Sequence, residues 1–441
     1  MTSVDTAATL PDETPAGDAA LFLGLALDYE QEWSRLQEEL RREDAMSRFL
    51  AYTVAEAPFY RSMVVAQPLH LDAFSPVGRD AFNQTPEHFL ARSLPIEDAH
   101  LAADTNGTIA AKLRVRFDRA AWFEFSYVTF AVVAERIPGL TDRTFPGEPG
   151  VFLINNCLYQ RRMSVYIPPL GLALLRQLVL ERSREEDEDV VRLLRARNIP
   201  LLYGKPSTLL LLADVDACLA GNERIRPFAI LVSGEALYAD QRRELENRFD
   251  STVYNAYVAT EGGLIAMECS RHCGLHLRDE FVYAEVVGED GAIRQEGSGD
   301  IVIATLFNRG HLFVRYRLGD WVEISRVECA CGFTGRTITT LRAREANRFV
   351  LPCGEIAAKT FERFLASLPL REFQVDQIGE ERPTLKWVAR DPSVSGVLHV
   401  QHAIERWLRD NGWLQWIEAV PMDAVTPRGG KHRRFVRLPR G

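Results

Sequence analysis

The segment TVYNAYVATEGG, residues 252–263, decides how we interpret this chain. Its beginning, Thr252-Val-Tyr254, is typical of a β-strand, and the polar turn from Tyr257 to Gly263 follows that strand. Two more polar segments follow apolar, strand-like sequence: Ser233-Gly234-Glu235 and Arg315-Tyr-Arg-Leu-Gly-Asp320. In open α/β sheets, polar groups at the carboxyl ends of strands converge on the ligand crevice. We therefore expect one ligand site built from all three segments.

The sequence around these segments predicts the α/β fold class. Strand-like runs at residues 151–154, 228–232 and 300–304 alternate with helical stretches at residues 187–196 and 239–249. Strand followed by helix, repeated along the chain, is typical of a sheet that is largely parallel and covered by helices. The middle of the chain should therefore form a large domain with parallel or mixed sheets.

Both ends of the chain differ from this middle. Residues 1–20 are rich in Thr, Ala, Asp and Pro without periodicity, which predicts a disordered tail. The spacing of apolar residues then predicts a helix over residues 26–53, which Pro58-Phe-Tyr-Arg61 breaks. Past Arg344, the patterns predict a small α+β domain, with helices at 355–368 and 398–411 and strands at 384–388 and 414–420. We divide the chain into a tail (1–20), a large domain (21–343) and a C-terminal domain (344–441).

Composition excludes several classes of protein. The 441 residues include 52 Lys and Arg against 61 Asp and Glu, so the net charge of −9 argues against nucleic acid as the main partner. No uninterrupted apolar run approaches the roughly 20 residues of a membrane span. The first twenty residues contain no Lys or Arg, which argues against an ordinary signal peptide. We expect a soluble, cytoplasmic protein without a membrane partner.

The cysteines suggest a metal site. Four of the seven form two close pairs, Cys269-x₃-Cys273 and Cys329-x-Cys331, and His272 and His276 lie beside the first pair. Thiolates and imidazoles favour Zn²⁺ in a closed tetrahedral site, and four protein ligands would make such a site structural. The alternative is a group of reduced cysteines that are neighbours in sequence only.

Five short motifs stand in the order found in adenylate-forming enzymes: Tyr203-Gly-Lys-Pro-Ser207, Ser233-Gly-Glu235, Tyr257 to Glu261, Arg315 to Asp320 and Gly429-Gly-Lys431. From about residue 50 to 441 the chain resembles the phenylacetate–CoA ligase branch of that superfamily. Ala57-Pro-Phe-Tyr-Arg61 and Cys329-Ala-Cys331-Gly332 also resemble that branch. The resemblance implies a large adenylation domain followed by a small, mobile lid domain.

The resemblance implies a role for each matching residue. Glu261 would ligate Mg²⁺ on the ATP phosphates, and Thr260 would contact the α-phosphate. Asp320 would accept hydrogen bonds from the ribose hydroxyls. Lys431 would touch the substrate carboxylate and the α-phosphate together, and so offset the charge that builds when one anion attacks another. The positions implied to contact nucleotide are Thr105, Thr108, Ser233, Gly234, Glu235, Asn255, Ala256, Tyr257, Thr260, Asp320 and Arg344.

Each of these residues also has an ordinary interpretation. Asp320 could simply close a turn, Glu261 could be a loop acid, and Lys431 could belong to a solvated basic tail. Their order along one chain favours the adenylating site. For zinc, the resembling branch suggests Cys269, His276, Cys329 and Cys331, with Cys273 as a spare or an alternative fourth ligand.

One motif departs from the family pattern. The phosphate loop of the family matches Thr105-Asn-Gly-Thr108 here, but its second glycine is missing and Lys112 is displaced by one place. Glycines in such loops let backbone N–H groups approach phosphate closely. Val258 also replaces the usual glycine after Tyr257. These changes raise the alternative of a nucleotide-binding homologue with weakened catalysis.

We therefore expect a carboxylic acid, aromatic by resemblance, to be activated as acyl-AMP and passed to coenzyme A. The expected cofactors are ATP, Mg²⁺ and structural Zn²⁺. An amine or a carrier-protein thiol is the alternative acceptor, and the sequence leaves the oligomeric state open, with a homodimer as one option. The candidates for an aromatic pocket are Phe125, Tyr159, Tyr203 and Tyr257, although aromatic residues in strands more often belong to the core.

Overall fold

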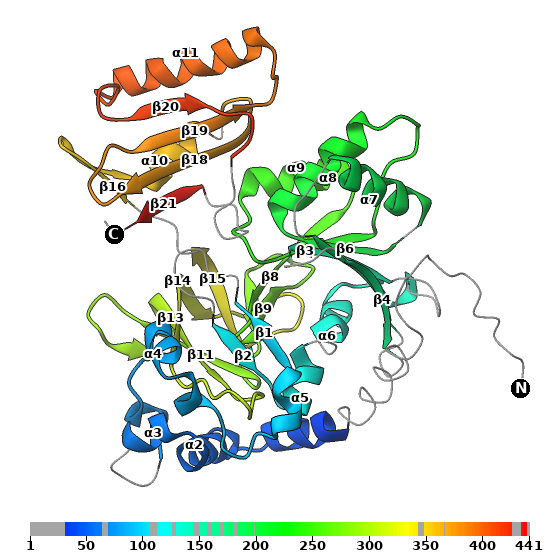
Figure 1. Ribbon diagram of the computed structural model, residues 1–441, viewed down its shortest axis with the longest axis vertical. Coiled ribbons are helices and arrows are strands. Elements are labelled where there is room, and N and C mark those ends of the chain that lie inside the picture. Colours follow the sequence, from blue (N-terminus) through cyan, green and yellow to red (C-terminus); the bar gives the residue numbers. More distant parts are fainter. Residues whose placement is uncertain are drawn as a thin grey trace, which may run out of the picture. The chain divides into compact units, whose positions relative to one another are not determined.

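The computed structural model describes twelve ranges of the chain: residues 31–63, 69–105, 113–125, 129–143, 150–156, 161–167, 172–179, 184–197, 199–342, 348–365, 367–425 and 434–438. The expected tail at 1–20 lies outside them. The chain separates into two compact units, Met1–Leu341 and Arg342–Gly441 (Figure 1). The boundary that we drew from the sequence, between residues 343 and 344, lies two residues after this one. In the described residues, no helix is both long and apolar enough to cross a membrane.

A large sheet forms the framework of the first unit. Within the described residues its thirteen strands, from one edge to the other, are β12 (Ile293–Arg294), β11 (Val282–Val287), β13 (Gly297–Thr305), β14 (Tyr316–Arg326), β15 (Arg336–Arg342), β10 (Leu275–Leu277), β9 (Gly263–Glu268), β8 (Thr252–Ala259), β7 (Ala229–Val232), β6 (Leu201–Gly204), β3 (Val151–Asn156), β5 (Leu172–Val179) and β4 (Arg161–Ile167). The strands from β5 to β8 pair in parallel, whereas β8 pairs with β9 in the antiparallel sense. The mixed α/β sheet expected from the sequence is therefore confirmed.

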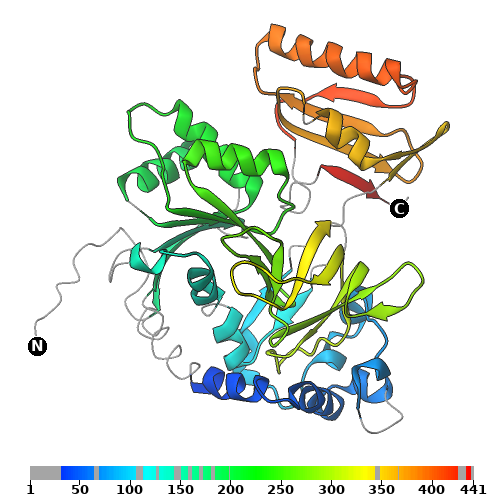
Figure 2. The ribbon, with the colours of Figure 1, turned by 180° about the vertical axis from the view of Figure 1, so that it is seen from behind.

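Helices cover both faces of the parallel half, as Figures 1 and 2 show. On one face lie α7 (Arg184–Ala196), α8 (Pro206–Cys218) and α9 (Ala239–Phe249), and on the other lies α6 (Thr129–Arg136). Strand β3 shows why this works: Phe152 and Ile154 pack with the first group, while Val151 and Leu153 pack with α6. Alternating side chains of a strand point to opposite faces of the sheet. A continuous apolar run therefore supplies buried side chains to the cores on both faces.

The N-terminal helix prediction needs a correction. Residues 31–40 are helical, but a turn at 41–44 separates them from α2 (Ala45–Glu56), so the expected helix over 26–53 is not continuous. The expected break at Pro58 is confirmed, since α2 ends at Glu56 and Pro58 begins a new helix, α3 (Pro58–Met63). Proline suits a first helical position because its fixed φ is already helical and its missing N–H is not needed there.

Short elements complete the first unit around the antiparallel half of the sheet. They are the 3₁₀ turns η1 (Leu71–Ala73), η2 (Pro86–Phe89) and η3 (Ile96–His100), the helices α4 (Arg79–Gln84) and α5 (Arg119–Phe123), and the hairpin of β1 (Ala102–Asp104) with β2 (Arg114–Arg116). Their aromatic side chains form a continuous core with that half of the sheet, in which Phe82 stacks on Phe89 and Phe313. The 3₁₀ turn η5 (Thr141–Arg143) instead lies beside the parallel half, where the Arg143 guanidinium lies over the Phe228 ring.

The second unit is a small α+β domain with a core of its own. Its elements are the hairpin β16 (Arg348–Leu351) with β17 (Gly354–Ala357), the sheet β20 (Glu418–Pro421), β19 (Thr384–Ala389), β18 (Leu370–Ile378) and β21 (Phe435–Leu438), and the helices α10 (Ala358–Leu365) and α11 (Val394–Asp410). Two predictions were wrong in extent. Residues 355–357, expected to start the helix, pair with β16 instead, and residues 414–416, expected in a strand, form a turn before β20.

Arg315 fixes the strand that carries one of the three polar segments. Its side chain is buried and donates to both carboxylate oxygens of Glu285, at 2.8 and 2.9 Å. It also donates to the carbonyl of Phe74 at 3.1 Å and to Asp72 at 2.8 Å. Arg315 adopts a left-handed backbone with φ 48°, which is uncommon for a residue with a side chain. These contacts hold that conformation directly before β14.

We expect Arg315→Ala to lower the stability of the first unit by about 3–5 kcal/mol, because the buried carboxylate of Glu285 loses its counter-charge. The midpoint of urea unfolding, followed by tryptophan fluorescence, measures the effect. Arg317→Ala is the matched control, since Arg317 is more exposed and lies 3.6 Å from Asp300; it should cost less than about 1 kcal/mol. Equal effects of the two variants would contradict this role of Arg315.

Candidate functional site

A hydrogen bond joins two of the three polar segments. Tyr257, near the end of β8, donates its hydroxyl to Oδ2 of Asp320 on β14 at 2.7 Å. The two residues are 63 positions apart in the sequence. Tyr257 is buried, whereas Asp320 is half-buried. Side chains that the sequence predicted to share a site therefore lie in direct contact.

The third segment lies at the ends of the parallel neighbours β6 and β7. The hydroxyls of Tyr203 and Ser233 share a hydrogen bond of 2.6 Å, and the backbone N–H of Ser207 donates to Glu235 at 3.3 Å. Gly234 has φ 82°, which glycine adopts without a steric penalty. The motifs Tyr203 to Ser207 and Ser233 to Glu235 thus form one surface at the carboxyl ends of the strands.

Glu261 is buried and held by two side chains. Arg79 of α4 and the hydroxyl of Tyr316 on β14 each donate to its Oε1 at 3.0 Å. Thr305 donates to the Glu261 carbonyl at 2.9 Å, which fixes the backbone as well. Burial and the nearby Glu261 raise the pKa of Tyr316, so this phenol stays protonated as a donor.

Arg79 is a residue that the sequence analysis missed. It lies 182 positions from Glu261 and belongs to none of the motifs, so no local signal could reveal it. Burial lowers its pKa, but the Tyr316 hydroxyl and Glu261 outweigh burial, and the pKa is raised overall. Arg79 and Tyr316 both donate to Oε1 of Glu261. A carboxylate oxygen is the kind of ligand that Mg²⁺ requires.

The remaining nucleotide candidates divide into described and undescribed positions. Thr105 closes the β1–β2 hairpin, since its hydroxyl accepts from the N–H of Leu113 at 3.0 Å. Thr260 is half-buried and directly precedes Glu261, and Ala256 is buried in the core beside α6. The backbone N–H of Asn255 donates to Glu268 at 2.9 Å. The expected positions outside the described residues are Thr108, Lys112, Arg344 and Lys431.

Two of the aromatic candidates have hydroxyls engaged in the site, as described for Tyr203 and Tyr257. Phe125 stacks on Phe117 with ring centroids 4.8 Å apart. Its ring also lies 3.8 Å from the place that a Cβ on Gly263 would occupy. Phe125 therefore stands beside the Glu261-Gly-Gly263 turn. Tyr159 lies outside the described residues.

The cysteines gather where two hairpin turns meet. Cys269 and Cys273 lie on the turn from β9 to β10, and Cys329 and Cys331 lie on the turn from β14 to β15. Strand β10 pairs with both β9 and β15, which brings the turns together. The first turn requires Gly274, with φ 111°, because a Cβ there would lie 2.8 Å from the Ile338 carbonyl.

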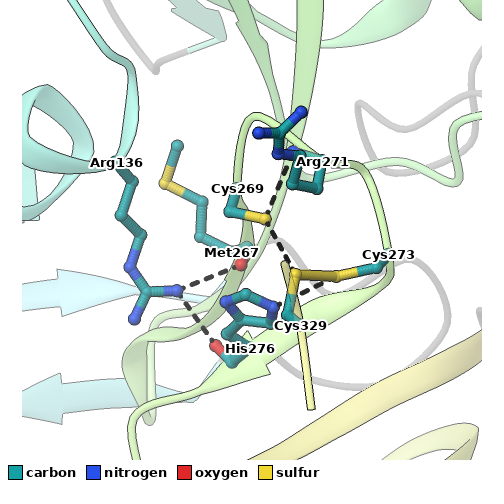
Figure 3. The surroundings of a disulfide bond; sticks show 7 residues. All are labelled: Arg136, Met267, Cys269, Arg271, Cys273, His276 and Cys329. Atoms are coloured by element: carbon teal, nitrogen blue, oxygen red, sulfur yellow. Dashed lines mark hydrogen bonds between the residues drawn. A yellow bond between two sulfur atoms is a disulfide. The ribbon is translucent and has the colours of Figure 1, made fainter. Parts of the chain in front are cut away.

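The donor atoms of Cys269, His276, Cys329 and Cys331 all lie within 4.8 Å of one another. A tetrahedral zinc ion with Zn–S bonds of about 2.3 Å separates its sulfurs by about 3.8 Å, and Cys269 Sγ lies 3.6 Å from Cys329 Sγ. This set therefore fits zinc. The structure also joins Cys273 to Cys329 by a disulfide bond, where we had expected a spare or alternative ligand (Figure 3).

The surroundings of the four donors suit a metal. The N–H of Arg271 donates to Cys269 Sγ at 3.3 Å, and the His276 ring stacks on Phe333. Arg136 donates to the carbonyls of Met267 and His276, which places a cation beside the thiols (Figure 3). Burial, followed by Arg136, lowers the pKa of His276, so its imidazole is neutral and able to act as a ligand.

Glu268 connects the two sites and was also missed. It accepts from Arg242 of α9 at 2.6 Å through Oε1, and from the Asn255 N–H at 2.9 Å through Oε2. His272, on the cysteine turn, lies 3.1 Å from Oε2 through its Nδ1. One buried carboxylate thereby ties β8 to the turn that carries Cys269 and Cys273.

Comparisons with known proteins give a fold. No protein-family model matches the chain, and no curated protein matches it. One similar solved structure is 2-hydroxyisobutyryl-CoA ligase in the postadenylation state, in complex with 2-HIB-AMP. The TM-score is 0.64 at 17% identity, over 98% of this chain and 94% of that one. The same ligase with 2-HIB-AMP and CoA, in the thioesterification state, gives a TM-score of 0.54 at 16% identity, over 99% and 95%.

A third similar structure is the ATP-bound RpMatB-BxBclM chimera B1, with a TM-score of 0.50 at 13% identity, over 78% of this chain and 68% of that one. The chain thus has the fold of these adenylate- and ATP-binding proteins. For 2-hydroxyisobutyryl-CoA ligase, the match covers nearly the full length of both chains. Sequence identities of 13–17% do not test membership of the phenylacetate–CoA ligase branch, which stays a prediction.

We expect Glu268→Gln to lower stability by about 1–2 kcal/mol at pH 7, because the ion pair with Arg242 is lost while hydrogen bonding is partly kept. Burial raises the pKa of Glu268, but His272 and Arg242 outweigh it, so the pKa lies below its ordinary 4.5. A lowered folded-state pKa stabilises the protein above pH 4.5, and this contribution is lost as the pH falls through the folded value.

The difference between wild type and Glu268→Gln should therefore shrink below about pH 4.5, in urea unfolding at pH 7, 5 and 4. Glu244→Gln on α9 is the control, because its i,i+4 pair with Arg248 is partly exposed and worth less than about 0.5 kcal/mol. A difference independent of pH would refute the assigned charge.

Proposed function

We propose that this protein activates a carboxylic acid with ATP, forming acyl-AMP and pyrophosphate, and transfers the acyl group to coenzyme A. The observation that carries the proposal is the contact of Tyr257 with Asp320. Two segments that resemble nucleotide-binding motifs meet there. Tyr257 lies near the carboxyl end of β8, as expected, whereas Arg315 directly precedes β14 and Asp320 lies within it, so this segment does not follow a strand as the sequence suggested. The fold shared with a ligase solved with 2-HIB-AMP and CoA supports the same assignment.

In the first half-reaction, a substrate carboxylate oxygen attacks the α-phosphorus of ATP. The bond from that phosphorus to the oxygen bridging to the β-phosphate breaks, and pyrophosphate leaves. Asp320 would accept the ribose hydroxyls, and the surface of Ser233, Gly234 and Glu235 would lie along the adenine. Thr260 and Lys431 would contact the α-phosphate, and Lys431 would offset the negative charge that two approaching anions build.

Glu261 would hold the Mg²⁺ that accompanies ATP, with Thr305 fixing the backbone and Tyr316 the carboxylate. When bound, this cation would supply charge neutralisation at the phosphates. Arg79 neutralises the buried Glu261 in the absence of nucleotide, since their atoms lie 3.0 Å apart. Arg79 therefore holds the carboxylate in place, and a bound Mg²⁺ would take over its role as counter-charge.

In the second half-reaction, the thiolate of coenzyme A would attack the acyl carbon of acyl-AMP, and AMP would leave. The C-terminal lid would first remove Lys431 and admit the thiol. We propose an aromatic acid as substrate, because Phe125 stands beside the Glu261-Gly-Gly263 turn and could line its pocket. An amine or a carrier-protein thiol is the alternative acceptor.

We also propose a structural Zn²⁺ held by Cys269, His276, Cys329 and Cys331. Zinc would cross-link the β9–β10 and β14–β15 turns. With four protein ligands, no coordination position would be open for catalysis. The support is the mutual proximity of the four donor atoms and the neutral state of His276.

The decisive test is mass spectrometry of reactions with Mg·ATP and a panel of aryl, alkyl and 2-hydroxy acids, each with and without coenzyme A. We expect an acyl-CoA product from at least one aryl acid. Acyl-AMP or AMP without thioester would replace coenzyme A by an amine or carrier-protein acceptor. Binding of AMP without any turnover would favour the homologue with weakened catalysis. The Asp320→Ala variant, which should lose nucleotide binding, controls for background chemistry.

Lys431→Ala should slow acyl-AMP formation by about 10²–10³-fold, because the charge that builds at the α-phosphate loses its counter-ion. Thioester formation from synthetic acyl-AMP and the affinity for ATP should change much less. Single-turnover kinetics of each half-reaction measure the difference. Arg433→Ala removes a neighbouring positive charge and should leave both steps nearly unchanged. An equal loss in both half-reactions would show that Lys431 has another role.

A further inference from the structure

We propose that Cys329 has two mutually exclusive partners, the zinc site and Cys273, so that oxidation of Cys273 with Cys329 releases the metal. This inference rests on the proposed zinc site. It concerns the five donors around that site, and it is independent of the adenylation chemistry.

The geometry brings both partners to the same sulfur. Cys329 Sγ belongs to the four-donor set, and the structure also bonds it to Cys273 (Figure 3). Cys273 Sγ lies 3.5 Å from His276 Nε2, so it stands at the edge of the same set without being one of the four. A sulfur in a disulfide has no thiolate charge to give to zinc. Cys329 can therefore serve only one partner at a time.

Exposure and ligation together indicate which thiol reacts first. Cys331 is exposed but belongs to the four-donor set, as do Cys269 and Cys329, which are 5% and 8% exposed. Cys273 is half-buried and lies outside that set. As the donor outside the ligand set, Cys273 would not be held by the metal when zinc is bound. An accessible thiol beside a second cysteine that can resolve it is the arrangement of redox-sensitive pairs. Cys273 would be attacked first, and Cys329 would resolve it.

The reaction balances with a low-molecular-weight disulfide as oxidant. The Cys273 thiol loses its proton and attacks one sulfur of the oxidant, which breaks the S–S bond of the oxidant and releases its first thiolate. The Cys329 thiolate leaves the metal and attacks Cys273 in the mixed disulfide, which releases the second. The two cysteines lose two electrons, the oxidant gains two, and the proton of Cys273 ends on one of the released thiolates.

Loss of Cys329 leaves Cys269, His276 and Cys331, a set of three donors. Three ligands hold zinc less tightly than a closed set of four. The new disulfide connects the same two hairpin turns that zinc had connected, since Cys273 lies on the first and Cys329 on the second. Oxidation would thus exchange a metal cross-link for a covalent one, and the pairing of β10 with β15 would be kept.

The experiment measures zinc and mass together on the full chain, purified under reducing conditions and titrated with oxidised glutathione. Elemental analysis should give one zinc per reduced wild-type chain and close to none after oxidation. Mass spectrometry should find a peptide linking Cys273 to Cys329, and thiol reductant with added zinc should reverse both changes. Cys273→Ser should keep its zinc, with half-release needing at least about tenfold more oxidant. Cys353→Ser, which removes an exposed cysteine elsewhere, should behave as wild type.

Three results would overturn the proposal. Loss of zinc from reduced Cys273→Ser would make Cys273 a ligand, and retention of zinc by the oxidised, cross-linked wild type would remove the competition for Cys329. Reduced wild type without zinc would reject the metal site and the competition with it. None of these results touches acyl-AMP formation, which is assayed separately, so failure here and failure of the proposed function are distinguishable.

Discussion

The arrangement of the first unit depends on one strand that pairs in two directions. Residues 252–255 of β8 pair in parallel with β7, and residues 256–259 pair in the antiparallel sense with β9. The parallel and antiparallel halves of the sheet therefore meet within eight residues. The direction of pairing changes within this strand, which carries Tyr257 near its end, and Thr260 follows it directly. The residues proposed to contact nucleotide therefore lie where the parallel and antiparallel halves of the sheet join.

Much of this could be predicted from the sequence, because the signals are local. Apolar runs predicted β3, β7 and β13, and the polar turns after strands predicted that Tyr257 and Asp320 would share a site. What the sequence could not predict was the support around them. Arg79 and Glu268 act through partners that only the folded sheet brings near, and neither stands in a recognisable motif. The error over residues 355–357 has a similar cause, since pairing with β16 overrides their helical pattern.

For the cysteines too, part of the site could be predicted from the sequence and part could not. Their spacing and the histidines between them predicted that sulfur and imidazole donors would gather, and the pairing of β10 with β9 and β15 brings them together. Spacing alone could not choose four donors among five. That choice depends on which sulfur lies nearest to Cys329, and both Cys269 and Cys273 come close. The sequence left open whether Cys273 is a ligand, and in the folded protein Cys273 also lies close enough to Cys329 to compete with the metal site.

Strand β9 gives the two sites a common physical basis. It begins at Gly263, two residues after Glu261, and ends at Glu268, directly before Cys269. All six of its residues are buried, and at about 3.3 Å per residue it spans about 20 Å. Glu268 and the cross-link at the cysteine turns anchor the far end of this strand. Glu261 is held separately, by Arg79 and Tyr316 at its carboxylate and by Thr305 at its carbonyl. One buried strand therefore connects the two sites, while each site keeps its own supporting contacts.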